Sequence, residues 1–150
     1  MAAHLALKAQ SGEQRIKIQL TIDHGGKKIV ANLNSFSSAL TRTEAEAPLK
    51  ADTAKNKVIY GSGIYLNMDL SILNDDLLRV LAKKDAKFNA TVTINDTYGK
   101  LPGKTILIKN ASLYSLSDQH STSVYGDGYG STMIAINCDQ LIVNGISLER

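Results

Sequence analysis

The chain has 150 residues, enough for one hydrophobic core, and its apolar content of 43% is ordinary for a globular protein. Its formal charge of +3 is mild and spread along the sequence, which argues against the clustered basic face of a nucleic-acid-binding protein. Aromatic residues make up only 5%, so we expect a core of Ile, Leu, Val and Ala. The one cysteine, Cys138, rules out an intramolecular disulfide, and its two-residue spacing from Ile136 indicates a buried position.

The N-terminal residues 1–14 are predicted to form a loosely held arm. They lack a basic start followed by a long apolar stretch, so we expect no secretory signal. No segment approaches the roughly 20 apolar residues that a membrane-spanning helix needs. The sequence therefore predicts a protein that is made in the cytoplasm and has no membrane partner.

Alternating side chains predict a hairpin at the start of the ordered region. Every second residue from Ile16 to Ile22 is apolar, and the residues between them are polar, which is typical of a half-buried strand. Gly25 and Gly26 follow as a turn, because glycine adopts positive φ at little cost. A returning strand over residues 27–36 repeats the alternation.

A single helix is predicted near the middle of the chain, over residues 75–84. Leucines recur at helical spacing between Leu73 and Leu81. Asn74 is a typical N-cap, acids occupy the first turn, and lysines at positions 83 and 84 occupy the last. We expect the apolar face of this helix to pack across one side of a sheet.

Strand patterns resume after the helix, at residues 88–96, 104–116 and 131–148. A polar turn over residues 96–103 separates the first two, and the second is expected to kink near Asn110. The order of several strands, one helix and several strands predicts an α+β, mainly β, single domain over residues 1–150.

Two long polar segments interrupt the strands. Residues 37–57 carry both charge signs, Pro48 and little periodicity, so they are predicted to form a long loop. This loop is either an arm that becomes ordered against a partner or a solvated loop. Residues 118–130 are rich in Gly, Ser and Asp and are predicted to form a second loop.

The patterns that carry catalysis or metal binding are missing from the sequence. His4, His24 and His120 lie in an arm, a turn and a loop, and none has a second ligand at i, i+4. There is no nucleophile elbow and no phosphate-binding loop of the G-x-x-x-x-G-K-[ST] type. We therefore expect a protein that is not an enzyme and that binds no cofactor and no metal.

The order and spacing of these segments resemble a phage tail tube protein of the contractile-tail and defective-prophage type. The type VI secretion tube protein shares the same general plan. The resemblance extends from about residue 15 to 148. It implies a tail-tube-like antiparallel β-sandwich or barrel with one flanking helix at residues 75–84. It is carried by the hairpin RIKIQLTIDHGGKKIVANL, the loop TRTEAEAPLKADTAKNK, the strand VIYGSGIYLNMDL, the helix NDDLLRVLAKKDAKF, and the strands KTILIKNASLYSLS and STMIAINCDQLIV.

The resemblance also implies a function and an assembly. Tube proteins form six-membered rings whose sheets join into one inner β-barrel, and the rings stack around a channel for DNA or cargo delivery. This implies a virion tail assembled in the host bacterial cytoplasm, with sheath and baseplate proteins as partners and DNA only in transient passage. The loop that reaches the neighbouring subunit or ring would be residues 41–57. Its charged side chains are candidates for setting register across that interface, or are only solubilising: Arg42, Glu44, Glu46, Lys50, Asp52, Lys55 and Lys57.

The alternative hypothesis is a monomeric β-sandwich that recognises carbohydrate or another protein. It would use the loop at residues 118–130, where Tyr125, Asp127 and Tyr129 offer rigid apolar area with polar groups. The two hypotheses differ in oligomeric state, because only the first requires many copies.

Overall fold

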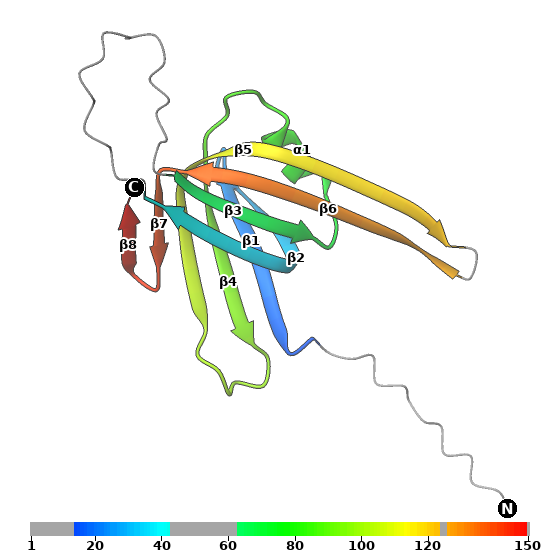
Figure 1. Ribbon diagram of the computed structural model, residues 1–150, viewed down its shortest axis with the longest axis horizontal. Helices are drawn as coiled ribbons and strands as arrows, with labels where there is room; N and C mark the ends of the chain where they lie inside the picture. Colours follow the sequence, from blue (N-terminus) through cyan, green and yellow to red (C-terminus); the bar gives the residue numbers. More distant parts are fainter. Residues whose placement is uncertain (1–13, 43–62, 124–125, 150) are drawn as a thin grey trace, which may run out of the picture.

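The computed structural model describes residues 14–42, 63–123 and 126–149. The fold consists of antiparallel strands with one short helix, which confirms the predicted α+β, mainly β class (Figure 1). In chain order the elements are β1 (Ile16–His24), β2 (Lys27–Thr41), β3 (Gly63–Leu70), α1 (Asp75–Leu81), β4 (Phe88–Asp96), β5 (Lys104–Ser123), β6 (Gly126–Cys138), β7 (Gln140–Val143) and β8 (Ile146–Glu149).

The strands form one hydrogen-bonded circuit. Their order is β4-β1-β2-β3-β6-β5-β7-β8, and an additional pairing between β4 and β5 closes the ring of ladders. The opening hairpin has its turn at the predicted glycines, with His24 opposite Lys27 across Gly25 and Gly26, whose φ angles are 59° and 77°. These positive angles explain why glycine occupies both turn positions.

Two strands bend and so belong to two layers. Residues 27–33 of β2 pair with β1, whereas residues 35–41 pair with β3 after a register shift. Residues 104–111 of β5 pair with β4, whereas residues 112–123 pair with β6. The bend in β5 lies at Asn110, which has a φ of 53°, as the predicted kink required.

The two layers have different members. The six-stranded sheet has the order β2-β1-β4-β5-β7-β8, with the first part of β2 and of β5. The four-stranded sheet has the order β2-β3-β6-β5, with the second part of β2 and of β5. Its β5–β6 hairpin projects well to one side of the rest of the molecule, as Figure 1 shows.

The core lies between the layers and is aliphatic, as the composition predicts. Ile22 and Val92 come from the six-stranded sheet and Leu66 and Ile136 from the four-stranded sheet, and each is at most 1% exposed. Cys138 is also buried, which confirms the position that its spacing indicates. The alternation of buried and exposed residues along each strand therefore places the core on one face of each layer.

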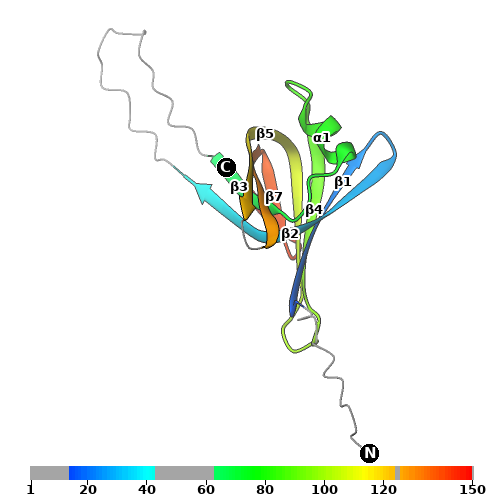
Figure 2. The same ribbon diagram turned by 90° about the vertical axis from the view of Figure 1, so that its right-hand side faces the viewer.

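The helix α1 begins where the sequence predicts and ends earlier. The Asn74 side chain accepts a hydrogen bond from the Leu77 N–H at 2.8 Å, which is the predicted N-cap. The predicted end at residue 84 was wrong, because the helix ends at Leu81 and Asp85 takes a left-handed φ of 60°. Figure 2 shows α1 beside the β1–β2 hairpin, to which an ion pair between Lys27 and Asp76 at 2.7 Å connects it.

Both predicted loops were wrong where the structure describes them. Residues 37–41 are part of β2, and the remainder of the predicted loop 37–57, residues 43–57, lies outside the described residues. Residues 118–123 and 126–130 belong to β5 and β6, so the segment predicted as a loop is largely the end of a long hairpin. Of the predicted arm 1–14, only Gln14 lies within the described residues.

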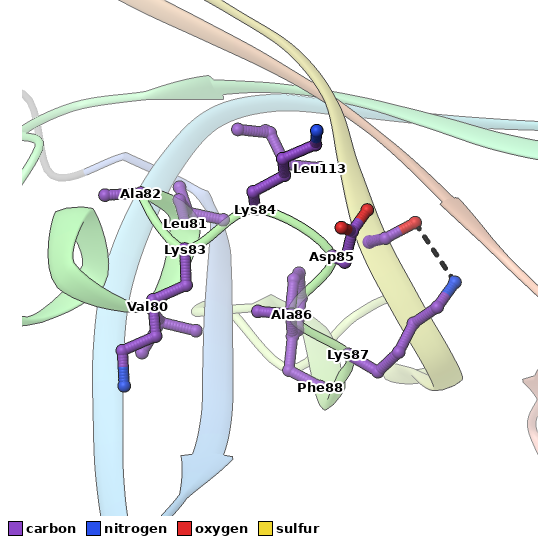
Figure 3. A pocket seen from close by; sticks show the side chains of 11 residues that line it. Val80, Leu81, Ala82, Lys83, Lys84, Asp85, Ala86, Lys87, Phe88 and Leu113 are labelled. Atoms are coloured by element: carbon purple, nitrogen blue, oxygen red, sulfur yellow. Dashed lines mark hydrogen bonds between the residues drawn. The ribbon is translucent and has the colours of Figure 1, made fainter.

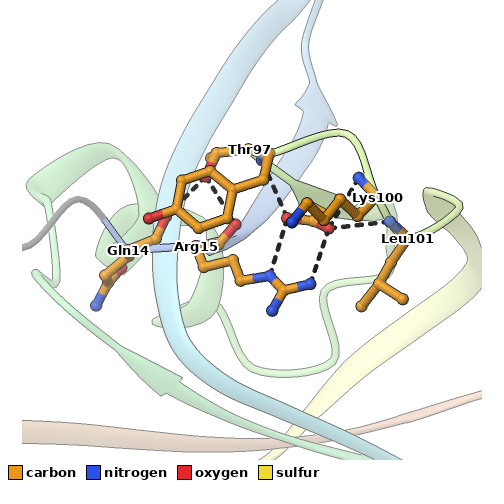
Figure 4. A network of polar contacts seen from close by, with 7 residues as sticks. Gln14, Arg15, Thr97, Lys100 and Leu101 are labelled. Atoms are coloured by element: carbon orange, nitrogen blue, oxygen red, sulfur yellow. Dashed lines mark hydrogen bonds and ion pairs between the residues drawn. The ribbon is translucent and has the colours of Figure 1, made fainter.

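A polar network joins the start of β1 to the β4–β5 turn. The Asp96 carboxylate accepts hydrogen bonds from the Arg15 guanidinium at 3.3 Å, from the Tyr98 N–H at 3.0 Å and from the Leu101 N–H at 2.9 Å. Thr97 Oγ1 donates to the Arg15 carbonyl at 2.9 Å, and Figure 4 shows these groups converging. Desolvation raises the pKa of Asp96, but the hydrogen bonds from Arg15, Tyr98 and Leu101 outweigh it and hold the pKa below its usual range.

Replacing this carboxylate is expected to change how stability depends on pH. Because the pKa of Asp96 is lower in the folded than in the unfolded chain, its ionised carboxylate stabilises the fold above about pH 4. This stabilisation is lost as the pH falls through the pKa that Asp96 has in the folded chain. The urea midpoint of Asp96→Asn should therefore lie below that of the wild type at pH 7, and the gap should narrow towards pH 3. Asp23→Asn removes a carboxylate that has no salt bridge among the described residues, and serves as the control. A gap for Asp96→Asn that is constant with pH would contradict this account.

Candidate assembly surface

Of the predicted interface residues, only Arg42 lies within the described residues. Its guanidinium Nη2 donates to the backbone carbonyl of Glu149 at 3.2 Å, so it connects the end of β2 to the end of β8. The other six lie outside the described residues: Glu44, Glu46, Lys50, Asp52, Lys55 and Lys57.

The four-stranded sheet has two unpaired edges. Within residues 14–42, 63–123 and 126–149, no strand pairs with the outer edge of β2 at residues 35–41. The same holds for the outer edge of β5 at residues 112–120, because β4 covers β5 only as far as Ala111. At about 3.3 Å per residue, the β2 edge is about 23 Å long. An exposed edge of this length is a template for pairing with another chain.

The two edges run in opposite directions. Each neighbouring pair in the order β2-β3-β6-β5 is antiparallel, so β2 and β5 point opposite ways at the two sides of the sheet. If the β5 edge of one copy meets the β2 edge of the next, the new pair is therefore antiparallel as well. Such a contact uses two different surfaces, and contacts of this kind generate rings when the rotation closes.

The face of the four-stranded sheet opposite the core is nearly uncharged; we call it the bare face. Strand register and alternation assign its residues, and within the described residues it holds no lysine or arginine. Among the side chains that the structure describes on this face, the charged one is Asp69, which accepts a hydrogen bond from Ser131 Oγ at 3.3 Å. The remaining described members are uncharged, and all but Met133 are small, polar or aromatic: Ser35, Ser37, Ala39, Thr41, Tyr65, Asn67, Ser112, Tyr114, Ser115, Ser117, Gln119, Met133, Ala135 and Asn137.

An aromatic pair stands on the bare face. The rings of Tyr65 and Tyr114 meet edge to face with centroids 6.3 Å apart, and both side chains are exposed, at 44% and 69%. The Tyr65 ring lies across Gly63, where an added Cβ would come within 2.5 Å of a ring carbon. Glycine at position 63 therefore allows the ring to lie along its own strand.

The outward-facing residues of β5 can be recognised in the sequence, but the segment lacks the regular alternation of apolar and polar residues that usually indicates a strand. In the segment ASLYSLSDQ the serines and one tyrosine face outward, and Ala111, Leu113 and Leu116 mark the inner side. Neutral polar residues are common in loops, so the segment beyond Asp118 was predicted as one. A run of small uncharged residues at every second position is the signal that indicates a strand here.

The hairpin segment of the alternative binding-module hypothesis forms part of a cleft. The cleft has a volume of about 600 Å³ and lies between residues 70–73 and the β5–β6 hairpin. Asp118 accepts hydrogen bonds from Thr132 Oγ1 at 2.7 Å and pairs with His120 at 2.9 Å, and these two contacts lower the pKa of Asp118. Asp118 is thus engaged within the hairpin, and Tyr125 lies outside the described residues.

The part of the chain that the structure describes contains no group of three or more His, Cys, Asp or Glu side chains placed to hold a metal ion. Over the same residues, no helix has the length and apolar content that crossing a membrane requires.

Comparison with known proteins identifies the fold. No protein-family model and no curated protein matches the sequence. The fold is similar to that of Hcp1 from Flavobacterium johnsoniae, with a TM-score of 0.59 and 12% identity over 89% of this chain and 99% of that one. It is also similar to that of Hcp1 from Salmonella typhimurium, with a TM-score of 0.56 and 13% identity over 89% of this chain and 91% of that one. Both are type VI secretion tube proteins, so the predicted relation to the tube-protein fold is confirmed at the level of structure.

Proposed function

We propose that this chain is a structural, non-enzymatic subunit of a tail-like tube, in which rings of six copies stack around a channel. The observation that carries the proposal is the four-stranded sheet with two unpaired edges that run in opposite directions. Pairing β5 of each copy with β2 of the next removes both edges at once, which an isolated chain cannot do. The Hcp1-like fold supports the same assembly.

Ring closure determines which face lines the channel. One face of the four-stranded sheet is covered by the core and the six-stranded sheet, so the bare face turns inward. Six copies contribute four strands each, and closed sheets of roughly 16–18 strands already enclose an aqueous channel. As far as the structure describes this face, the channel wall would then consist mainly of neutral side chains, with the Asp69 carboxylate and the Tyr65–Tyr114 pair.

The wall chemistry bears on what passes through the tube. Proteins hold nucleic acid mainly by neutralising phosphates with lysine and arginine. Because the strands give this face neither among its described residues, and only Lys87 reaches its margin at Ser112 Oγ, DNA would be held weakly at most. The proposal includes delivery of DNA or of a protein cargo, and sheath and baseplate proteins as outer partners. The site of action would be a virion tail or a related extracellular tail assembled from the cytoplasm.

Assembly of the purified protein tests the proposal. We expect light scattering to give a mass about six times the 16.2 kDa of the chain, and negative-stain microscopy to show rings and stacks of rings. A protein that stays monomeric up to millimolar concentration, also with sheath and baseplate proteins present, would overturn the proposal.

A further inference from the structure

A pocket with a lysine rim lies between α1 and the unpaired edge of β5. It has a volume of about 320 Å³ and is lined by the segment from Val80 to Phe88 together with Ser112 and Leu113. Leu81 and Phe88 are buried and form part of an apolar floor. We call this the lysine-rimmed pocket, and Figure 3 shows its side chains. Its rim carries Lys83, Lys84, Asp85 and Lys87.

Local backbone geometry brings the lysines to the rim. The helix closes with the Ala82 N–H bonded to the Leu78 carbonyl at 2.8 Å, and the chain then turns tightly, with the Ala86 N–H bonded to the Lys83 carbonyl at 3.3 Å. Asp85 reverses the chain direction with its positive φ of 60°. Lys83, Lys84 and Lys87 are all exposed, so three positive charges and one negative charge surround the opening.

The pocket lies where a neighbouring copy must leave the sheet. Phe88 of β4 pairs with Ala111 of β5, so an incoming strand has room on this edge only from Ser112 onwards. Lys87 stands at that boundary, with its Nζ 3.4 Å from Ser112 Oγ. An incoming β2 runs antiparallel to β5, and its final residue, Thr41, therefore arrives at the Ser112 end and meets the start of β4 head-on. The chain that follows Thr41 has to turn out of the sheet beside Lys87.

The sequence after Thr41 complements this pocket. It reads Arg-Thr-Glu-Ala-Glu-Ala-Pro over positions 42–48, with acids alternating with alanines. If the segment docks in an extended form, in which successive side chains point to opposite sides, Glu44 and Glu46 would share one side and Ala45 and Ala47 the other. Two carboxylates facing lysines and two methyl groups facing an apolar floor would match the pocket in charge and in apolar character.

We propose that residues 44–47 of one copy dock into the lysine-rimmed pocket of its neighbour in the same ring. This inference rests on the proposed function and adds to it the pocket that receives the segment and the residues 44–47 that enter it. The opposing charges are accounted for: Arg42 is held by the Glu149 carbonyl of its own copy, and Asp85 is outnumbered by the three lysines on the rim. The contact secures each junction of the ring at the point where β-pairing ends.

Charge reversal tests the docking. We expect Glu44→Lys with Glu46→Lys, and separately Lys83→Glu with Lys87→Glu, to raise the concentration for half-maximal ring formation by about tenfold, because attraction becomes repulsion. Combining all four substitutions should restore assembly to within about threefold of the wild type. The control is Lys100→Glu with Lys104→Glu, which removes the same charge outside the pocket. Light scattering measures assembly, and circular dichroism verifies the fold of each variant.

The outcomes separate the two proposals. Wild-type rings together with reversals that assemble like the control would overturn the docking and leave the tube proposal intact. Absence of rings in the wild type would overturn the tube proposal and the docking with it. Loss of assembly in both reversals without rescue in the combined variant would also overturn the docking, because the effect would then not come from this pair of surfaces.

Crosslinking distinguishes docking within a ring from docking between rings. Glu46→Cys with Lys87→Cys, treated with a short bis-maleimide, should give a ladder on a denaturing gel that ends at six chains. Each single cysteine variant is a control, and the native Cys138 is only 4% exposed. No interchain product, or a ladder that continues past six chains, would overturn docking within the ring.

Discussion

Proline in the unpaired edge of β2 is expected to leave a folded protein that forms no rings. Successive residues of a strand direct their N–H groups to opposite edges, so of the neighbours Ser37 and Ser38 one points to β3 and the other to the open edge. Proline has no N–H, and at the outward position it removes a donor that only a neighbouring copy would use. We expect assembly to be lost across the concentration range in which the wild type forms rings.

The two variants, Ser37→Pro and Ser38→Pro, serve as controls for each other. The variant whose N–H faces β3 should be destabilised by about 1–3 kcal/mol, because a carbonyl inside the sheet loses its donor. Ser37→Ala and Ser38→Ala keep the backbone donors and should assemble normally. Light scattering gives the assembly state and urea denaturation gives the stability. The idea of edge-to-edge pairing would fail if both proline variants folded and still formed rings at wild-type concentrations.

Truncating the centre of the four-stranded sheet is expected to cost the most folding stability. Leu66 is 0% exposed and lies between Ser38 on β2 and Ile136 on β6. Leu66→Ala removes buried methyl groups and leaves a cavity, and changes of this kind lower the free energy of unfolding by about 2–5 kcal/mol. Assembly into rings would raise the apparent free energy of unfolding. The effect of Leu66→Ala should therefore be measured in the proline variant that folds as a monomer.

The neighbouring position supplies the control for the core. Asn67 is next in the strand and faces the opposite way, onto the bare face. Asn67→Ala should change the unfolding free energy by no more than about 0.5 kcal/mol. Equal losses at the two positions would contradict the assignment of the core to one face of this sheet.

Local rules predicted the parts of the fold in which one pattern dominates. The hairpin over residues 16–33 has alternating apolar residues and two glycines at its turn, and these features predicted its two strands and the turn between them. The start of α1 follows from Asn74 as the cap. Its end does not, because Lys83 and Lys84 suit a last helical turn and the chain nevertheless turns at Asp85.

Long-range features were beyond these rules. The outer part of β5, from Asp118 onwards, carries few apolar residues because it extends past the core, so it lacked the pattern of a buried strand. An unpaired edge is defined by the strands that do not reach it, and no local pattern contains that information. Loop 41–57 was predicted to meet a neighbour from a resemblance, whereas the lysine-rimmed pocket that complements it emerges only when α1, β4 and β5 meet.

The number of strands in the four-stranded sheet constrains how such a protein could diverge. Its two edges run in opposite directions because the strands alternate and their number is even. Insertion or loss of a single strand would make the edges run the same way and turn every junction between copies into a parallel one. Insertion or loss of a whole hairpin would preserve the junction and change only the circumference. Relatives with wider or narrower channels should therefore differ by hairpins or by the number of copies, and not by single strands.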